Sequence, residues 1–446
     1  MVAKLFMLGM CVFLNQVEYN KYADVLMLKH DFNRSDWWGV DRFNFVFAWD
    51  GLYFLNAIRK GYMHVKNYAF YPGLPFLLTC LDTAASKLIP FYARLREDPS
   101  SLLLLGYVGC LLNFALHFAS NVLLFKLARL RGLTMQASRR IGYLFALMGT
   151  GFYHTVFYSE SLYFFVVLYG LYRLELLYAR HVPLSQLPLQ PFLLLTLLLS
   201  LSGFLRSVGL LNGAFLGYPL LLEFVKYLRL REFKQCVNIL FRMAMVIAMF
   251  IIPTVKLFIE TRSKFCTDGG NPEYLLPDFC LSKYGFFYDF IQKKFWSVEF
   301  LSEWKNGQCW LYLVVLNTYP VVYFAFKRFF RENRLKDLLT LNIPLYLQSD
   351  TLNEPRIRQL PDFVILLITL RTYYFYANQN SVERLLTSNY FYFFLMNSFQ
   401  EERNKKSHTG LASWVLNWVL KTLLFGNCLV RIFLTPYFFV TRLYPI

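Results

Sequence analysis

Four short stretches of this sequence place polar residues inside or beside long apolar runs, where they are costly and therefore candidate functional sites. The first holds Trp49, Asp50 and Tyr53. A carboxylate beside aromatic rings could act as the general base for a sugar hydroxyl, because partial desolvation raises its basicity, and the rings could stack on sugar faces. The pattern alone favours a plainer alternative, which is an interfacial helix with aromatic anchors and a solvated Asp50.

The second and third stretches add an acidic and a basic residue beside or within the apolar runs. Residues 158–161 bring Tyr158 and Glu160 between two apolar runs. Glu160 could bind sugar hydroxyls or orient a catalytic group, or the motif could be an ordinary helix cap. Residues 203–213 contain Arg206 and Asn212. Arg206 could clamp a lipid phosphate through its guanidinium fork or pair structurally with a buried carboxylate, and its neighbouring glycines fit close helix packing.

The fourth stretch is a loop between residues 266 and 304 with interleaved aromatics, including Gln292 and Trp296. The loop is nearly neutral, so a carbohydrate or a lipid headgroup is a better candidate ligand than RNA. The alternative is a folded loop whose aromatic side chains merely lie at the membrane interface. Cys266, Cys280 and Cys309 flank this loop, where an oxidising compartment could pair two of them. No cluster of residues has metal-ligand spacing, so no metal is expected.

The elements that must position these residues are membrane helices. The 446 residues are 57% hydrophobic and 19% aromatic, with a net charge of +18. This composition excludes a soluble enzyme, a disordered chain and a disulfide-rich miniprotein. A nucleic-acid partner is not expected either, because basic loops of a membrane protein account for the charge. About 8 to 12 spans are predicted among the apolar runs, which are 2–17, 70–90, 101–125, 141–157, 158–178, 191–225, 240–259, 309–326, 361–376, 385–399 and 411–434.

Charge orients these spans. Residues 126–140 carry a balance of +5, and residues 226–242 and 327–336 carry +4 each, which is typical of cytoplasmic loops. The nearly neutral loops 18–66 and 260–308 are therefore predicted to be lumenal, and the sequon at 33–35 falls in the first. This orientation needs an odd number of spans between 18–66 and 126–140, so 70–90 is interpreted as broken or re-entrant. The chain, 1–446, is predicted to be one membrane domain.

The four stretches together resemble the PIG-V family of endoplasmic reticulum mannosyltransferases. The correspondence is collinear from about residue 24 to 304, whereas the family's C-terminal His, Gln and Arg-Phe-Leu do not recur. The matching segments are WDGLYF at 49–54, GY at 61–62, AFYPGLP at 69–75, YSES at 158–161, RSVGLLN at 206–212 and IQKKFWSVEFL at 291–301.

The resemblance implies an all-α, polytopic membrane protein of the GT-C glycosyltransferase type. Its activity would be transfer of the second mannose, through an alpha-1,6 linkage, from dolichyl phosphate mannose to a GPI glycolipid precursor at the lumenal face of the endoplasmic reticulum membrane. No cofactor is implied beyond this donor, and a small stabilising membrane subunit is a further expected partner. A beta-linked donor and an alpha product imply one inverting displacement.

The hypothesis for the site gives each candidate a role. Asp50 is the base, with Asp41 in the same loop as the reserve candidate, and Arg206 binds the donor phosphate. Glu160 and Gln292 contact the sugar or the acceptor. The remaining expected substrate contacts are Trp49, Tyr53, Tyr158, Asn212 and Trp296.

Three alternatives remain open from the sequence. Another dolichyl-phosphate-sugar transferase of the same fold would use the same carboxylate and aromatics. A lipid transporter would place its sites at the bilayer midplane between repeated halves, and the sequence shows no such repeat. A non-catalytic subunit of GPI assembly would tolerate the loss of Asp50.

Overall fold

The fold is all-α within the part of the chain that the computed structural model describes. These residues are 50–90, 101–147, 153–266, 278–281, 285–296, 298–301, 305, 323–324, 326–327, 329–331, 335–349, 351–352, 354–375 and 389–406. Their helices, with the short 3₁₀ helices written η, are α4 (Asp50–Lys60), η2 (Val65–Ala69), α5 (Gly73–Leu88), α7 (Ser101–Leu130), α8 (Met135–Leu147), α9 (Glu160–Ala179), η4 (Leu184–Gln186), α10 (Leu189–Leu205), η5 (Ser207–Gly213), α11 (Ala214–Arg229), α12 (Phe233–Phe265), α13 (Asp278–Leu281), α14 (Phe287–Trp296), α18 (Leu335–Leu339), α19 (Ile343–Ser349), α20 (Pro355–Phe375) and α22 (Tyr390–Lys406).

Four stretches among the described residues are long and apolar enough to cross a membrane: Leu104–Leu130, Glu160–Ala179, Ser207–Arg229 and Phe233–Phe265. The shorter α10 is also apolar. At 1.5 Å per residue, the 33-residue α12 is about 50 Å long, more than the roughly 30 Å of a bilayer core. These helices confirm the prediction of an all-α, polytopic membrane protein.

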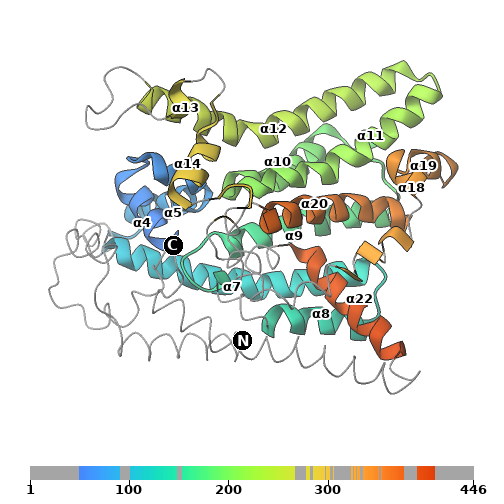
Figure 1. Cartoon of the computed structure of the whole chain (residues 1–446), viewed down its shortest axis with the longest axis horizontal. Helices are drawn as coiled ribbons and strands as arrows, with labels where there is room; N and C mark the ends of the chain where they lie inside the picture. Colours follow the sequence, from blue (N-terminus) through green and yellow to red (C-terminus); the bar gives the residue numbers. More distant parts are fainter. Residues whose placement is uncertain are drawn as a thin grey trace.

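The helices run between two ends of the molecule (Figure 1). At one end, called the site end here, lie α4, α5, α13 and α14, on the left of the figure. At the other, called the basic end, lie α18, α19 and the turn between α11 and α12. The turn between α7 and α8 belongs to the basic end too, because its Arg131 reaches Glu175 near the end of α9. The basic loops 126–140 and 226–242 thus lie at one end, opposite α4 and α14.

Two of the predicted apolar runs are interrupted in the structure. The run 191–225, which is long enough to be split into two spans, divides into α10 and α11, and η5 connects them. The prediction of a continuous span over 141–157 is wrong, because α8 ends at Leu147 and residues 153–159 precede α9 without forming an α-helix. The side-chain amide of Asn113 on α7 donates to the carbonyls of Val156 and Tyr158 at 2.6 and 2.7 Å. This side chain supplies the hydrogen bonds that a helix would otherwise make.

The run 70–90 forms the short helix α5 at the site end. Its 16 residues are about 24 Å long, which is less than a bilayer core. Gly73 begins the helix against the end of α10, where an added Cβ would lie 2.6 Å from a methyl carbon of Leu205. A short helix beside α4 agrees with the interpretation of 70–90 as a re-entrant segment. The candidate spans 2–17, 309–326 and 411–434 lie wholly or mainly outside the described residues.

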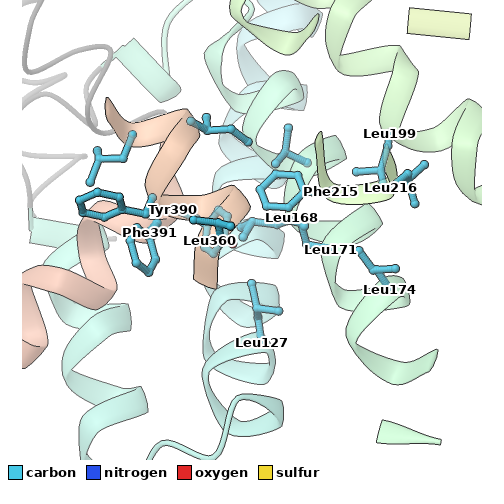
Figure 2. Packing of buried hydrophobic residues seen from close by; sticks show 14 of the residues in the cluster. Leu127, Leu168, Leu171, Leu174, Leu199, Phe215, Leu216, Leu360, Tyr390 and Phe391 are labelled. Atoms are coloured by element: carbon cyan, nitrogen blue, oxygen red, sulfur yellow. The ribbon is translucent and has the colours of Figure 1, made fainter. Parts of the chain in front are cut away.

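A large apolar core joins the long helices. It includes Leu168 and Leu171 of α9, Leu216 of α11 and Leu360 of α20, all nearly inaccessible (Figure 2). Tyr390 and Phe391 of α22 close the same cluster. Helices α20 and α22 therefore share one hydrophobic core with α7 to α11.

A network of buried charges crosses this core near the basic end. Arg131 lies 2.7 Å from Glu175 and 2.6 Å from Asp362, measured between guanidinium nitrogens and carboxylate oxygens. Arg358 also pairs with Glu175, and the hydroxyl of Tyr390 donates to Asp362. The two cations match the two carboxylates, so the network carries no net charge while it links α9 to α20 and α22.

Candidate active site

The first component of the candidate site is Asp50, the opening residue of α4. Its carboxylate sits in the first turn of the helix, where the partial positive charge of the helix N-terminus favours an anion. Asp50 is half-buried, whereas Phe54 one turn later is buried. The Phe54 ring meets Phe70 and Phe157 edge-on, which holds α4 to the segment before α9. The predicted residues Asp41 and Trp49 lie outside the described residues.

The second component is an ion pair between Arg206 and Glu160. Arg206 ends α10 and Glu160 begins α9, and a guanidinium nitrogen lies 2.5 Å from a carboxylate oxygen. The side chain of Glu160 is fully buried, while that of Arg206 is 15% exposed. The Arg206 guanidinium also lies 6.0 Å from the centre of the Tyr163 ring. Of the two roles predicted for Arg206, the pairing with a buried carboxylate is present in the structure.

The Tyr-Ser-Glu-Ser motif does not form the helix cap that was its alternative. Ser159 stands at the cap position of α9 without a side-chain capping bond. Ser161 donates to the carbonyl of His154 at 2.5 Å instead. The ring of Tyr158 is 1% exposed and stacks on Tyr153, so it packs inside the protein rather than facing a ligand. The motif thus fixes where α9 starts and where Glu160 lies.

Hydrogen bonds of Asn212 and the close packing of Gly209 hold the backbone around Arg206. The amide of Asn212 donates to the hydroxyls of Ser202 and Tyr163 at 2.9 and 3.2 Å. Gly209 packs directly on α10, because a Cβ on it would lie 2.0 Å from the carbonyl oxygen of Ser202. Asn212 is buried and lines a small internal cavity, and its described bonds are structural. The prediction of close packing by the glycines is therefore confirmed for Gly209.

The third component comes from α14 in the second loop. The hydroxyls of Tyr288 and Ser207 lie 3.0 Å apart, which joins α14 to the residue after Arg206. Burial raises the pKa of Tyr288, and the charge of Asp50 raises it further, whereas the bond to Ser207 and the charge of Arg206 oppose this rise. The hydroxyl of Tyr288 therefore lies within electrostatic reach of both the carboxylate of Asp50 and the guanidinium of Arg206.

The predicted contacts Gln292 and Trp296 lie further along α14. Gln292 follows Tyr288 by four residues, so the two share a face of the helix. Gln292 is half-buried. Trp296 ends the helix, and its side chain lies outside the described part of the structure.

Aromatic packing binds the two loops together at the site end. Tyr68 of η2 is fully buried against Phe287 and Ile291 of α14, and its hydroxyl donates to Glu260 at 2.8 Å. Tyr53, predicted as a sugar contact, stacks on Phe70 with ring centres 4.5 Å apart. One face of the Tyr53 ring is thus already covered. The two segments predicted as separate lumenal loops therefore pack against each other.

A disulfide secures the second loop. Cys266 and Cys280 are bonded, with their Cα atoms 5.3 Å apart, and the bond connects the end of α12 to α13. The expectation that two of the three loop cysteines pair is confirmed. Cys309 lies outside the described residues.

Sequence reasoning did not single out Ser207, Tyr163 or Tyr288. Ser207 stood within the Arg206 motif, and Tyr288 stood among the many aromatics of the second loop. Tyr163 follows Glu160 by three residues, the spacing at which helical neighbours meet. Among the described residues, no group of three or more His, Cys, Asp or Glu could hold a metal ion. That no metal is used stays a prediction.

Comparison with known proteins shows the family of this chain. The family model described as mannosyltransferase (PIG-V) matches residues 32–431, which is most of the chain. The chain belongs to the PIG-V mannosyltransferase family. The match extends well past residue 305, where the motif correspondence ends, and includes α20 and α22.

Two curated relatives carry the name GPI mannosyltransferase 2. The protein of Chaetomium globosum is 25% identical over 285 residues, which cover 60% of this chain and 59% of the relative. The protein of Aspergillus oryzae is 24% identical over 274 residues, which cover 60% of this chain and 56% of the relative. The alignments thus span less than two thirds of either relative. No solved structure matches the chain.

Proposed function

We propose that this protein transfers the second mannose of a GPI anchor. The donor is dolichyl phosphate mannose, the acceptor is the one-mannose GPI precursor, and the new linkage is alpha-1,6. The family supports a mannosyl transfer, and the names of the two relatives support the GPI substrate. The GT-C type of fold and a small partner subunit remain predictions of the resemblance.

In this proposal the transfer is a single displacement at the anomeric carbon. Asp50 takes the proton of the acceptor hydroxyl as that oxygen attacks, and the bond between the anomeric carbon and the phosphate oxygen breaks on the opposite face. Arg206 stabilises the negative charge that develops on the leaving dolichyl phosphate. Asp41 remains the reserve candidate for the base.

Glu160 is assigned an orienting role. Its carboxylate is fully buried and lies 2.5 Å from Arg206, so it is poorly placed to meet a sugar. It holds the guanidinium in place while the partly exposed portion of Arg206 receives the phosphate. Gln292, on the Tyr288 face of α14, is assigned to the sugar or the acceptor.

Two observations support a lumenal site in the endoplasmic reticulum membrane. The disulfide between Cys266 and Cys280 lies at the site end, and disulfides persist in oxidising compartments. The basic loops lie at the opposite end, which suits the cytoplasmic face. The sequon at 33–35 would then be lumenal, although it lies outside the described residues.

One observation carries the proposal. The fold brings three parts to one end of the bundle: α4 of the first loop, α14, and the turn between α10 and η5 at Arg206, called the Arg206 turn here. Asp50→Asn keeps the size of the side chain and removes its basicity, so transfer should fall by at least about 100-fold, as expected for loss of a general base. Asp289→Asn is the matched control, because Asp289 lies at the same end on α14 but is 63% exposed and paired with Lys293.

The assay is accumulation of GPI intermediates in cells that lack the protein and carry each variant. Cells with Asp50→Asn should accumulate the one-mannose species, while Asp289→Asn should restore the normal ladder. A normal ladder with Asp50→Asn would remove Asp50 from the role and favour a non-catalytic subunit. A normal ladder in cells without the protein would overturn the proposed function.

A further inference from the structure

Tyr288 links α14 to two other parts of the site end. Its hydroxyl lies 3.0 Å from that of Ser207, the residue that follows Arg206. Its ring meets Tyr71 edge-on, with centres 6.1 Å apart, in the segment that leads into α5. A single side chain of the second loop therefore contacts both the segment before α5 and the residue after Arg206.

The backbone around Arg206 is fixed by several contacts. Asn212 and Gly209 hold the turn to α10. Arg206 has an extended backbone, with φ −152° and ψ 147°, between the end of α10 and the start of η5. Its N–H donates to the carbonyl of Ser202 at 3.0 Å, and its carbonyl accepts from the N–H of Gly209 at 2.9 Å. The hydrogen bond between Ser207 and Tyr288 adds a contact with α14 at the residue directly after Arg206.

We propose that Tyr288 is a positioning residue that sets the placement of the Arg206 guanidinium relative to Asp50, and thereby the use of the donor phosphate. This inference rests on the proposed function and deepens it. The phenol acts from α14, which is held in place by Phe287 and Ile291 against Tyr68. The second loop then affects the binding and use of the donor through the hydroxyl of Tyr288. That hydroxyl takes no part in making or breaking bonds of the substrates.

Electrostatics agrees with this placement. The charge of Asp50 acts on the Tyr288 hydroxyl to raise its pKa, and the charge of Arg206 acts to lower it. Since burial makes the larger contribution and raises the pKa, the phenol remains protonated at neutral pH and can keep its hydrogen bond to Ser207. The protonated hydroxyl adds no charge of its own to the site.

The test is a double-mutant cycle with kinetics in purified protein. Tyr288→Phe and Ser207→Ala each remove one hydroxyl of the pair, so each should lower kcat/KM for dolichyl phosphate mannose by about 5- to 10-fold, the effect of one lost hydrogen bond. The double variant should be no worse than either single variant, because the bond is already lost. KM for the acceptor should stay within twofold. Tyr143→Phe, at an exposed position on α8, is the matched control and should keep wild-type kinetics.

Two outcomes would overturn the role of Tyr288. One is a fall in kcat/KM in the double variant that equals the product of the falls in the two single variants. The other is an unchanged kcat/KM for the donor in Tyr288→Phe. Binding of dolichyl phosphate, the product, separates this inference from the proposed function. Wild-type protein that binds no dolichyl phosphate contradicts the proposed function, whereas equal binding by wild type and Tyr288→Phe contradicts only the positioning role.

Discussion

Removal of the Glu160 carboxylate tests the central ion pair of the site. Glu160→Gln keeps the shape of the side chain but leaves the Arg206 guanidinium without its counter-charge. Breaking a buried pair by loss of one partner costs about 3 to 5 kcal/mol. Because Arg206 keeps 15% of its side chain exposed, water compensates part of the loss. We therefore expect the lower value, about 3 kcal/mol, which is roughly a 150-fold change in the unfolding equilibrium.

The expected loss can be measured as a thermal shift. For a chain of this length, 1 kcal/mol corresponds to about 1 °C in the unfolding midpoint, so Glu160→Gln should lower the midpoint by about 3 °C. Helical circular dichroism of the protein in detergent micelles follows the transition. The same variant should lose most transfer activity, since Arg206 is no longer directed.

A second substitution separates the structural from the chemical effect. In Glu160→Gln/Arg206→Gln neither charge remains, so stability should return to within about 1 kcal/mol of the wild type while transfer stays lost. A single variant with an unchanged midpoint would refute the buried pair. A double variant less stable than the single one would show that Arg206 is not held by Glu160.

Two further predictions concern the supports of the site. Gly209→Ala forces a Cβ to within 2.0 Å of an α10 carbonyl oxygen. It should therefore lower the free energy of unfolding by about 2 kcal/mol or more and abolish transfer. Gly217→Ala, with open space around its Cβ, is the control and should be neutral in both assays. Cys280→Ser removes the disulfide to Cys266 and should lower the unfolding free energy of the second loop by about 3 kcal/mol, given its 14-residue separation. Reductant should reproduce this loss in the wild type, and limited proteolysis of the loop measures it. Cys80→Ser, at an exposed free thiol, is the control, and equal protease resistance of both variants would contradict a role for the bond.

The sequence predicted the helical class and the charged ends, because both depend on local composition. It located Glu160 and Arg206 separately but could not decide between a phosphate clamp and a structural pair. That choice depends on the packing of α9 beside α10, which joins residues 46 positions apart. The span at 141–157 was predicted wrongly for a similar reason, since Asn113 of another helix satisfies its backbone carbonyls.

Tyr288 illustrates the remaining limit of sequence reasoning. Phe286, Phe287 and Tyr288 stand side by side in the second loop, and composition alone does not distinguish them. The fold separates them, because Phe287 turns into the core while Tyr288 reaches Ser207. Recognising residues 287–296 as a helix would have placed Tyr288 and Gln292 on one face. It would not have shown which part of the protein that face contacts.

The buried charges near the basic end bear on how the chain is assembled during synthesis. Arg131 and Glu175 are made long before Arg358 and Asp362, and until α20 is present they can pair only with each other. A chain that stops before α20 therefore keeps one of the network's ion pairs and lacks the contacts that Arg358 and Asp362 add. Premature termination anywhere before residue 355 should produce a less stable protein that quality control removes, even though Asp50, Glu160 and Arg206 are all intact.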